Sequence, residues 1–445
     1  MVVVVRANGF HSHRFWRPRD VQRECRHLGK ALHLHALLRL MKTATQYYKA
    51  IAVLTLNVLV IFGCLNIGAM ALLKIRSAES TPERVVDRRE KSSYYTDKSW
   101  APRYWNEIDQ ARKEQYHPYT VWRRAPFKGE LVNIDEDGVR LTPGSDCRPN
   151  AFKVFTFGGS SMWGTGSPDW GTIPAFLEPG FENWKQKPVC IRNFGETGYV
   201  STQSVIELML QVQSGNIPDI VIFFDGSNDV YAAYQSGKSG VHENLERIAA
   251  RMERRDQPQS PLLIQLLESF SLFRLIDNQV THLKDARPAP ALITYETMHV
   301  DLKTLTETVT TKYLNNYEAV SALAEKHGFD YYVFWPAHLT STKKPLTNEE
   351  QGLKHAVEPG LEKLYESVYQ AMQPDVISRY KHLYSITDVF DKTQSLIWLD
   401  DSHVTPTGNE MIAQRMLQVI TGGGAGGFLT KGSHDHKDVA STSFH

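Results

Sequence analysis

Cysteine is scarce in this sequence, and neither sign of charge predominates. The four cysteines among 445 residues are too few to hold a disulfide-rich scaffold, and their spacing matches no zinc site. The 50 basic and 49 acidic residues give a net charge of +1, and the main body contains no long basic run. Nucleic acid is therefore not an expected partner. The length and the 42% hydrophobic content suit one large globular domain with additional segments.

The cysteines fall into two groups. Cys25 and Cys64 lie before or within a long apolar segment, whereas Cys147 and Cys190 lie in the main body. For the second pair, two interpretations stay open: two small buried thiols, or a disulfide formed in an oxidising compartment.

Long apolar runs are absent except for residues 50–73, which carry no charge and are long enough to cross a bilayer as a helix. A core helix of this length would ordinarily keep a polar face, so we expect a single transmembrane helix. Apolar residues continue beyond a weak lipoprotein-like site at 61–64, which favours an anchor that is not cleaved. Two starts are open: Met1, which gives a basic cytoplasmic tail, and Met41, which opens a signal-anchor sequence.

Basic residues flank the apolar segment on both sides, so the distribution of charge does not decide its orientation. We expect the main body to lie outside the cytoplasm, in the periplasm. The predicted organisation is a basic tail (1–49), the transmembrane anchor (50–73), a stalk (74–115), a β-hairpin prelude (116–150), the main domain (151–421) and a flexible tail (422–445). The hairpin of the prelude is expected around a turn at 135–138.

Predicted strands and helices alternate through the main domain. Short apolar runs predict strands at 153–157, 188–192, 219–224, 331–335 and 383–386. Helical spacing predicts helices near 201–213, 242–255, 301–326, 359–380 and 407–420. This alternation predicts a three-layer α/β/α flavodoxin-like sandwich with a parallel sheet of about five strands. Residues 262–283 also have helical spacing, and they form either a lid or core helix or a membrane-surface helix.

Three segments directly follow predicted strands, where a parallel sheet places its binding sites. In the first, glycines precede Ser160 and permit a tight turn that exposes a hydroxyl and its backbone N–H. In the second, Gly198 can present an unobstructed N–H to a developing oxyanion. In the third, Asn228 can donate to the same oxyanion from its side chain. Each segment alone is also consistent with an ordinary loop or a helix cap.

A fourth segment, which contains Asp400 and His403, precedes the last predicted helix. An aspartate three residues before a histidine can hold one imidazole nitrogen while the other faces a hydroxyl. Histidine fixed in this tautomer can act as a general base, and a serine hydroxyl beside it then becomes nucleophilic. Taken alone, the segment is more typical of a solvated turn.

In their order and strand-end positions, the four segments resemble the sequence blocks of the SGNH (GDSL-type) hydrolase superfamily. The resemblance covers most of the main domain. It implies a catalytic triad of Ser160, His403 and Asp400. It also implies an oxyanion hole formed by Ser160, Gly198 and Asn228.

One departure from the founding family pattern is Gly159, which stands where that pattern has aspartate. Ser161 is a rival nucleophile one position later, and Asp401 is a rival to Asp400. The prelude and Pro336, after the fourth strand, also resemble a membrane-anchored bacterial branch of the family.

The resemblance implies acyl transfer through an acyl-enzyme, with no metal and no organic cofactor. The expected substrate is a small-molecule, glycan or lipid ester. Two other functions stay open: an O-acyltransferase acting on a glycan, and a non-catalytic surface protein on the same fold. Trp163, Tyr199 and Tyr231 lie near the segments, where they either line the site or pack in the core.

Overall fold

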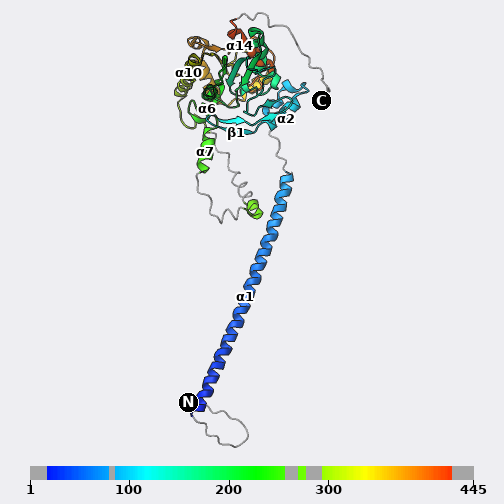
Figure 1. Cartoon of the computed structure of the whole chain (residues 1–445), viewed down its shortest axis with the longest axis vertical. Coiled ribbons are helices and arrows are strands. Elements are labelled where there is room, and N and C mark those ends of the chain that lie inside the picture. Colours follow the sequence, from blue (N-terminus) through cyan, green and yellow to red (C-terminus); the bar gives the residue numbers. More distant parts are fainter. Residues whose placement is uncertain (1–17, 80–85, 256–268, 277–292, 423–445) are drawn as a thin grey trace. The chain divides into compact units, whose positions relative to one another are not determined.

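The computed structural model describes residues 18–79, 86–255, 269–276 and 293–422 (Figure 1). The chain divides into two compact units. They are Met1–Arg84 with Pro258–Ala289, and Val85–Gln257 with Pro290–His445. All but the first residue of the predicted flexible tail lies outside the described residues.

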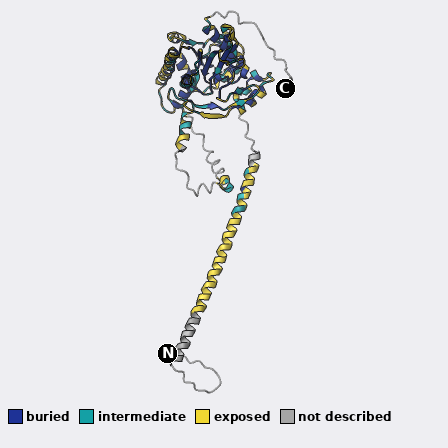
Figure 2. Ribbon diagram, in the orientation of Figure 1, coloured by how far each residue is buried: buried dark blue, intermediate teal, exposed yellow. Residues whose placement is uncertain are grey.

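The first unit contains one long helix, α1 (Pro18–Glu79), which includes the whole predicted anchor. Within the described residues, His33–Ile75 is the one helical stretch that is long and apolar enough to cross a membrane. Its large apolar side chains are almost all exposed (Figure 2). Such a surface suits a bilayer. The described part of the predicted 1–49 tail is helical and continuous with this stretch.

Residues 269–276 are the described part of the apolar segment predicted at 262–283. The ring of Phe270 packs edge-on against that of Phe62 in α1, with 5.0 Å between the centroids. The N–H of Leu272 donates to Oδ1 of Asn66, 3.1 Å away. The rest of the segment lies outside the described residues, so the choice between a lid or core helix and a membrane-surface helix stays a prediction.

The second unit is built around one five-stranded sheet. Its strands are β5 (Phe152–Gly158), β6 (Val189–Asn193), β7 (Ile220–Phe224), β8 (Asp330–Trp335) and β9 (Leu383–Ser385). All neighbouring pairs are parallel, and the order is β6-β5-β7-β8-β9. This is the strand order of flavodoxin-like folds. The predicted fold class and all five predicted strands are therefore confirmed.

Helices cover both faces of this sheet (Figure 1). One face packs against α5 (Ser201–Gln213), α6 (Ser227–Ser236), α10 (Leu302–His327) and α12 (Pro359–Ala371). The other packs against α4 (Ile173–Lys185) and α14 (Pro406–Ile420). In β7, Val221 and Phe223 join the first core, while Ile220 and Ile222 join the second. Burial on both faces explains why this strand is an unbroken apolar run.

The predicted helix at 359–380 divides in two, since α12 ends at Ala371 and a short helix, α13 (Pro374–Ile377), follows. Proline causes this break because it lacks the N–H that continues a helix and disfavours helical backbone in the residue before it. The other four predicted helices are confirmed within a few residues, including α7 (Leu245–Arg255). Helices α4, α6 and α11 (Asn348–His355) were not predicted.

Residues 86–111 differ from the predicted stalk. They form two 3₁₀ turns and α2 (Ala101–Gln110), and they pack on the rest of the second unit through buried aromatic side chains. Tyr104 and Trp105 are almost completely buried there. The carboxylate of Glu107 accepts from three consecutive backbone N–H groups, those of residues 130–132. This part of the predicted stalk is therefore a folded layer of the main domain.

Two small antiparallel pairs follow. They are β1 (Glu114–His117) with β2 (Val121–Arg124), and β3 (Phe127–Lys128) with β4 (Asn133–Ile134). The predicted turn at 135–138 is closed by the N–H of Gly138, which donates to the carbonyl of Asp135 over 3.0 Å. Ile134 then pairs antiparallel with Arg140, so the hairpin at this turn is confirmed.

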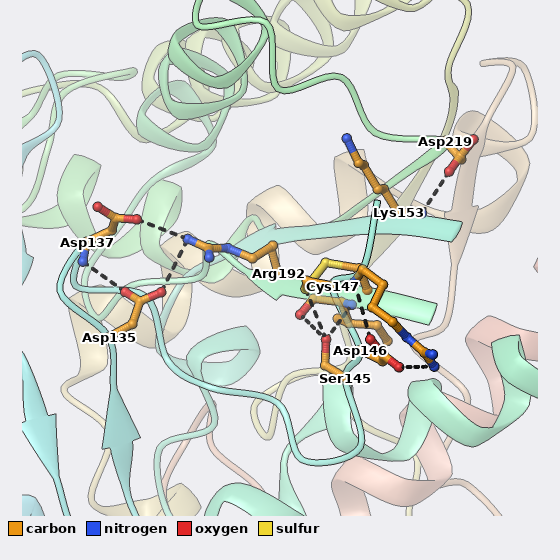
Figure 3. The surroundings of a disulfide bond; sticks show 11 residues. Asp135, Asp137, Ser145, Asp146, Cys147, Lys153, Arg192 and Asp219 are labelled. Atoms are coloured by element: carbon orange, nitrogen blue, oxygen red, sulfur yellow. Dashed lines mark hydrogen bonds and ion pairs between the residues drawn. A yellow bond between two sulfur atoms is a disulfide. The ribbon is translucent and has the colours of Figure 1, made fainter. Parts of the chain in front are cut away.

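Cys147 and Cys190 form a disulfide, which selects one of the two open interpretations (Figure 3). The bond joins the loop before β5 to the edge strand β6. On the same strand, Nη2 of Arg192 lies 3.3 Å from a carboxylate oxygen of Asp135 and 3.4 Å from one of Asp137. The disulfide and these ion pairs connect residues 135–147 of the prelude to β6, the edge strand of the sheet.

Candidate active site

The residues singled out by the sequence lie at the carboxyl edge of the sheet. Ser160 begins α3 (Ser160–Trp163) directly after β5, and Asn228 lies in the first turn of α6 after β7. Asp400 and His403 lie in the loop before α14. Because β5 and β7 are neighbouring parallel strands, the loops that follow them meet at one edge.

Ser160, His403 and Asp400 form a hydrogen-bonded chain. Oγ of Ser160 lies 2.6 Å from Nε2 of His403, and Nδ1 of His403 lies 2.7 Å from Oδ2 of Asp400. The other oxygen of Asp400 accepts from the backbone N–H groups of His403, at 2.7 Å, and Ser402, at 2.9 Å. Ser160 is 8% exposed and the His403 side chain 12%, so both are largely buried and a small part of each is open to solvent.

The environment of Asp400 keeps its carboxyl group ionised. Burial opposes ionisation, but the charge of His403 and its hydrogen bonds outweigh this and lower the pKa of Asp400 well below its usual range. The guanidinium of Arg89 contributes in the same direction. An ionised Asp400 can hold the imidazole with its proton on Nδ1, which leaves Nε2 free to accept a proton from Ser160.

The two rival residues have other partners. Oγ of Ser161 donates to the carbonyl of Ser402 over 3.3 Å. Asp401 pairs instead with the buried His338, whose Nε2 lies 3.7 Å from a carboxylate oxygen. Among the described residues, neither rival forms a hydrogen bond with His403. The geometry therefore favours Ser160 and Asp400.

Asn228 lines a small cavity together with Ser160. Its Nδ2 donates to the carbonyl of Tyr199 over 2.8 Å, which leaves the second amide hydrogen for another acceptor. Gly159 makes room for this amide, because a Cβ at position 159 would overlap Nδ2 of Asn228. Gly198 has a φ of +77°, a left-handed backbone conformation that favours glycine. It lines a second cavity and not the one at Ser160.

Arg89 is a residue of this site that sequence reasoning missed. Its Nη1 lies 3.0 Å from Nδ1 of His403 and 3.3 Å from Oδ2 of Asp400. Asp87 holds the other side of the guanidinium, accepting from Nε at 2.9 Å and from Nη2 at 2.7 Å. Arg89 and Asp400 are 311 residues apart in the sequence. The one sequence feature that included Arg89 was the basic flank after the apolar segment, and it did not indicate a place in the site.

Glu350 was also missed, and it stabilises the loop that leads to Asp400. Its Oε1 accepts from the backbone N–H groups of Ile397, at 2.9 Å, and Trp398, at 3.1 Å. Its Oε2 lies 2.7 Å from Nζ of Lys344, and both side chains are fully buried. A buried pair of this kind is costly to break, so these contacts stabilise the loop in the position that it has here.

Two buried carboxyl groups lie beside Asn228. Asp229 accepts from both the N–H and the hydroxyl of Ser201, and Asp225 accepts from the hydroxyls of Ser204 and Tyr317. Burial raises the pKa of Asp225 to about 8, and the charge of Asp229 contributes. Burial also raises the pKa of Asp229 to about 6. The protonated form of Asp225 is therefore favoured at neutral pH.

We expect the Asp225→Asn substitution to weaken the pH dependence of stability. The folded-state pKa of about 8 exceeds the ordinary value of 3.8, so this group's contribution to stability is complete below about pH 4. That contribution is lost as the pH rises through about 8. Asparagine has the shape of the protonated group and does not titrate, so the variant should come closest to the wild type at about pH 4 and unfold at a higher temperature than the wild type at about pH 9.

Thermal unfolding followed by circular dichroism at the two pH values measures this difference. Asp375→Asn is the matched control, because this side chain is 74% exposed. An Asp225→Asn variant that loses stability with pH as steeply as the wild type would contradict the expectation.

The three aromatic residues near the motifs have different surroundings. Tyr199 lines the cavity at Ser160. Trp163 is buried between the guanidinium groups of Arg124 and Arg140, at 4.4 and 4.3 Å from its ring. Tyr231 is partly buried against the first core. In the described part of the chain, no group of three or more His, Cys, Asp or Glu side chains is placed to hold a metal ion.

No family model matches the chain, and a comparison with curated proteins gives no match. Similar solved structures include the acetyl xylan esterase AlAXEase, at 15% identity, with 60% of this chain and 99% of that chain covered and a TM-score of 0.34. The lipase Lip_vut3 from goat rumen metagenome is 11% identical, with 60% and 96% covered and a TM-score of 0.33. Axe2, an acetylxylan esterase from Geobacillus stearothermophilus, is 12% identical, with 63% and 96% covered and a TM-score of 0.30.

Other similar structures are described as lipolytic proteins of the G-D-S-L family, for example one from Veillonella parvula. The similar solved structures thus include acetylxylan esterases, a lipase and lipolytic proteins of the G-D-S-L family.

Proposed function

We propose that the chain is a membrane-anchored serine esterase that hydrolyses acyl esters through an acyl-enzyme. The chain of contacts from Ser160 through His403 to Asp400 carries this proposal. Each contact has the geometry required for its role: a hydroxyl beside an imidazole nitrogen, and a carboxylate beside the other.

In the proposed reaction, Oγ of Ser160 attacks the ester carbonyl while Nε2 of His403 accepts its proton. The N–H groups of Ser160 and Gly198 and the side chain of Asn228 stabilise the oxyanion, each contributing about 3 kcal/mol. His403 then returns the proton to the departing alcohol. Water, activated by the same imidazole, releases the acid from Ser160. No metal and no organic cofactor takes part in these steps.

The disulfide supports the proposed location of the main domain outside the cytoplasm. Structural disulfides persist in oxidising compartments such as the periplasm and are rare in the cytosol. The bond between Cys147 and Cys190 therefore favours an orientation in which the main domain is translocated. The basic flanks of α1 leave this choice open on their own.

Covalent labelling tests the proposed nucleophile directly. The protein in detergent micelles is treated with an organophosphonate probe for activated serines, and the adduct is located by mass spectrometry. An adduct on Ser160 supports the proposal. A folded protein that reacts nowhere, or that reacts at Ser161 instead, contradicts it.

Gly159→Ala is expected to lower turnover by about 10²-fold while changing KM little. The added Cβ would displace the side-chain amide of Asn228 and so remove one donor to the oxyanion. Asn228→Ala should lower turnover by a similar factor for the same reason. Steady-state kinetics with an activated acetyl ester measure both, and a double variant no worse than either single variant would show a shared cause. Full activity in Gly159→Ala would contradict the role given to Asn228.

A further inference from the structure

One face of the apolar run in α1 is covered, whereas the rest of the run is exposed. Between residues 50 and 73, all but five residues are exposed. Ala69 is buried, and Phe62, Gly63, Asn66 and Leu73 are partly buried. Phe62, Asn66, Ala69 and Leu73 follow one another at steps of four, three and four residues, so they form one stripe along the helix. These four residues are the docking face.

Residues 269–276 lie against the docking face, in the same compact unit as α1. The ring of Phe270 packs edge-on against that of Phe62, with 5.0 Å between the centroids. The N–H of Leu272 donates to Oδ1 of Asn66 over 3.1 Å. Residues 271–276 are helical, and this N–H belongs to their first turn, where it has no partner within the helix. The contact therefore pairs two polar groups that would be costly to leave unpaired in hydrocarbon.

The two contacts lie well inside the apolar run of α1. Phe62 is near the middle of residues 50–73, and Asn66 precedes the end of the run by seven residues. Seven residues of helix correspond to about 10 Å along the axis, and the hydrocarbon core of a bilayer is about 30 Å thick. Where α1 crosses a bilayer, a segment in contact with Phe62 and Asn66 must lie inside the same bilayer.

The exposed side chains of residues 269–276 suit lipid. Phe273 and Ile276 are 41% and 51% exposed, whereas Phe270 and Leu272 are partly buried. Arg274 is the one charged residue of the segment, and a long basic side chain of this kind can extend to the lipid headgroups. As a complete helix the segment would be about 12 Å long, which is too short to cross the bilayer.

We propose that residues 269–276 form a second membrane-embedded element, a short helix that packs on the docking face of α1 and does not cross the bilayer. This inference rests on the proposed membrane anchor and is independent of the esterase chemistry. The chain reaches the segment from α7 and returns to residue 293, and both belong to the second unit. The segment therefore enters and leaves the bilayer on one side.

The second membrane element restricts the orientation of the main domain. A domain connected to the bilayer by one stalk can rotate about it, whereas a second attachment opposes this rotation. The second attachment follows α7, whose Arg247 and Arg251 line the cavity that Gly198 also lines. The part of the main domain that is attached to the bilayer is thus the part that contains a proposed oxyanion donor.

Cross-linking between two cysteines tests the packing in native membranes. Gly63→Cys and Ser271→Cys are combined in the full chain, with Cys25→Ser and Cys64→Ser to remove the cysteines outside the disulfide. A Cβ at Gly63 would meet no atom within 4 Å, so cysteine fits there. After treatment with a short bifunctional maleimide, the chain is cut at a protease site inserted after Glu79. A gel then shows whether the two fragments remain joined.

Leu65→Cys with Ser271→Cys is the matched control, because Leu65 is 53% exposed and lies on the opposite side of α1 from Gly63. The fragments should stay joined in the Gly63 pair and separate in the Leu65 pair. Equal joining in the two pairs, or separation in both, would overturn the inference.

The role of Asn66 is tested in the Gly63→Cys, Ser271→Cys background. Asn66→Leu removes the acceptor of the Leu272 N–H, so cross-linking should slow by about threefold or more. Asn57→Leu is the control, since it makes the same change in an exposed residue of the same helix. An unchanged rate in Asn66→Leu, or an equal loss in Asn57→Leu, would overturn the packing as described.

Reaction with a membrane-impermeant maleimide separates this inference from the proposed anchor. Phe273→Cys, Leu54→Cys and Tyr380→Cys are each made in the chain without Cys25 and Cys64, and the membranes are opened to the reagent by freezing and thawing. Tyr380→Cys, in the main domain, should react, whereas the other two should react only after detergent is added. Reaction of Phe273→Cys alone without detergent would overturn the second membrane element. Reaction of Leu54→Cys would instead overturn the anchor.

Discussion

Replacing Ser160 with alanine is expected to lower the turnover of an activated acetyl ester by about 10⁶-fold. The substitution removes Oγ, the atom that lies 2.6 Å from Nε2 of His403 and that is proposed to form the acyl bond. Alanine is close in size to serine, and the site lies at the start of a short helix, so the fold should be unchanged. Residual activity would come only from the oxyanion donors and from binding.

Ser161→Ala is the matched control for this prediction. The hydroxyl of Ser161 donates to the carbonyl of Ser402 and lies off the path to His403, so turnover should fall by no more than about tenfold. Steady-state kinetics and circular dichroism on both variants separate chemistry from folding. Activity that survives in Ser160→Ala and disappears in Ser161→Ala would exchange the two assignments.

The sheet was predictable because its strands are short apolar runs. A strand covered by helices on both faces needs no alternation of polar and apolar residues. The almost unbroken apolar run at 219–224 has this pattern in the sequence. The candidate triad was predictable for a related reason. Its members sit directly at strand and helix ends, and Asp400 and His403 are close in sequence, so local spacing already brings their side chains together.

Contacts between residues far apart in sequence could not be predicted in this way. Residues 86–111 are rich in charge, and this concealed the buried aromatic face that packs them on the main domain. Arg89 reaches the site only because that layer folds back onto the sheet. The same holds for Glu350, whose carboxylate meets the N–H of Ile397 across 47 positions. A helical pattern in either segment indicates which face is buried but not which loop lies against it.

Asp400→Asn is expected to lower turnover by about 10⁴-fold with little change in KM. An amide can donate to Nδ1 of His403, and the imidazole proton then moves to Nε2, where it faces Ser160 and prevents proton transfer. Arg89 reinforces this tautomer, because its Nη1 lies 3.0 Å from Nδ1 and can donate to it once the carboxylate is gone. In the wild type, the ionised carboxylate at 2.7 Å opposes both effects by accepting the Nδ1 proton.

This account makes the Asp400→Asn defect depend on Arg89. Adding Arg89→Gln to Asp400→Asn removes the second donor to Nδ1, so the double variant should be about tenfold more active than Asp400→Asn alone. Asp401→Asn is the control and should stay within about tenfold of the wild type, since its carboxylate lies 3.7 Å from His338 and not at His403. Kinetics across a range of pH on the four proteins measure these effects. If Asp401→Asn loses as much activity as Asp400→Asn, or if the double variant is less active than Asp400→Asn alone, the carboxylate and Arg89 do not act on the imidazole as described.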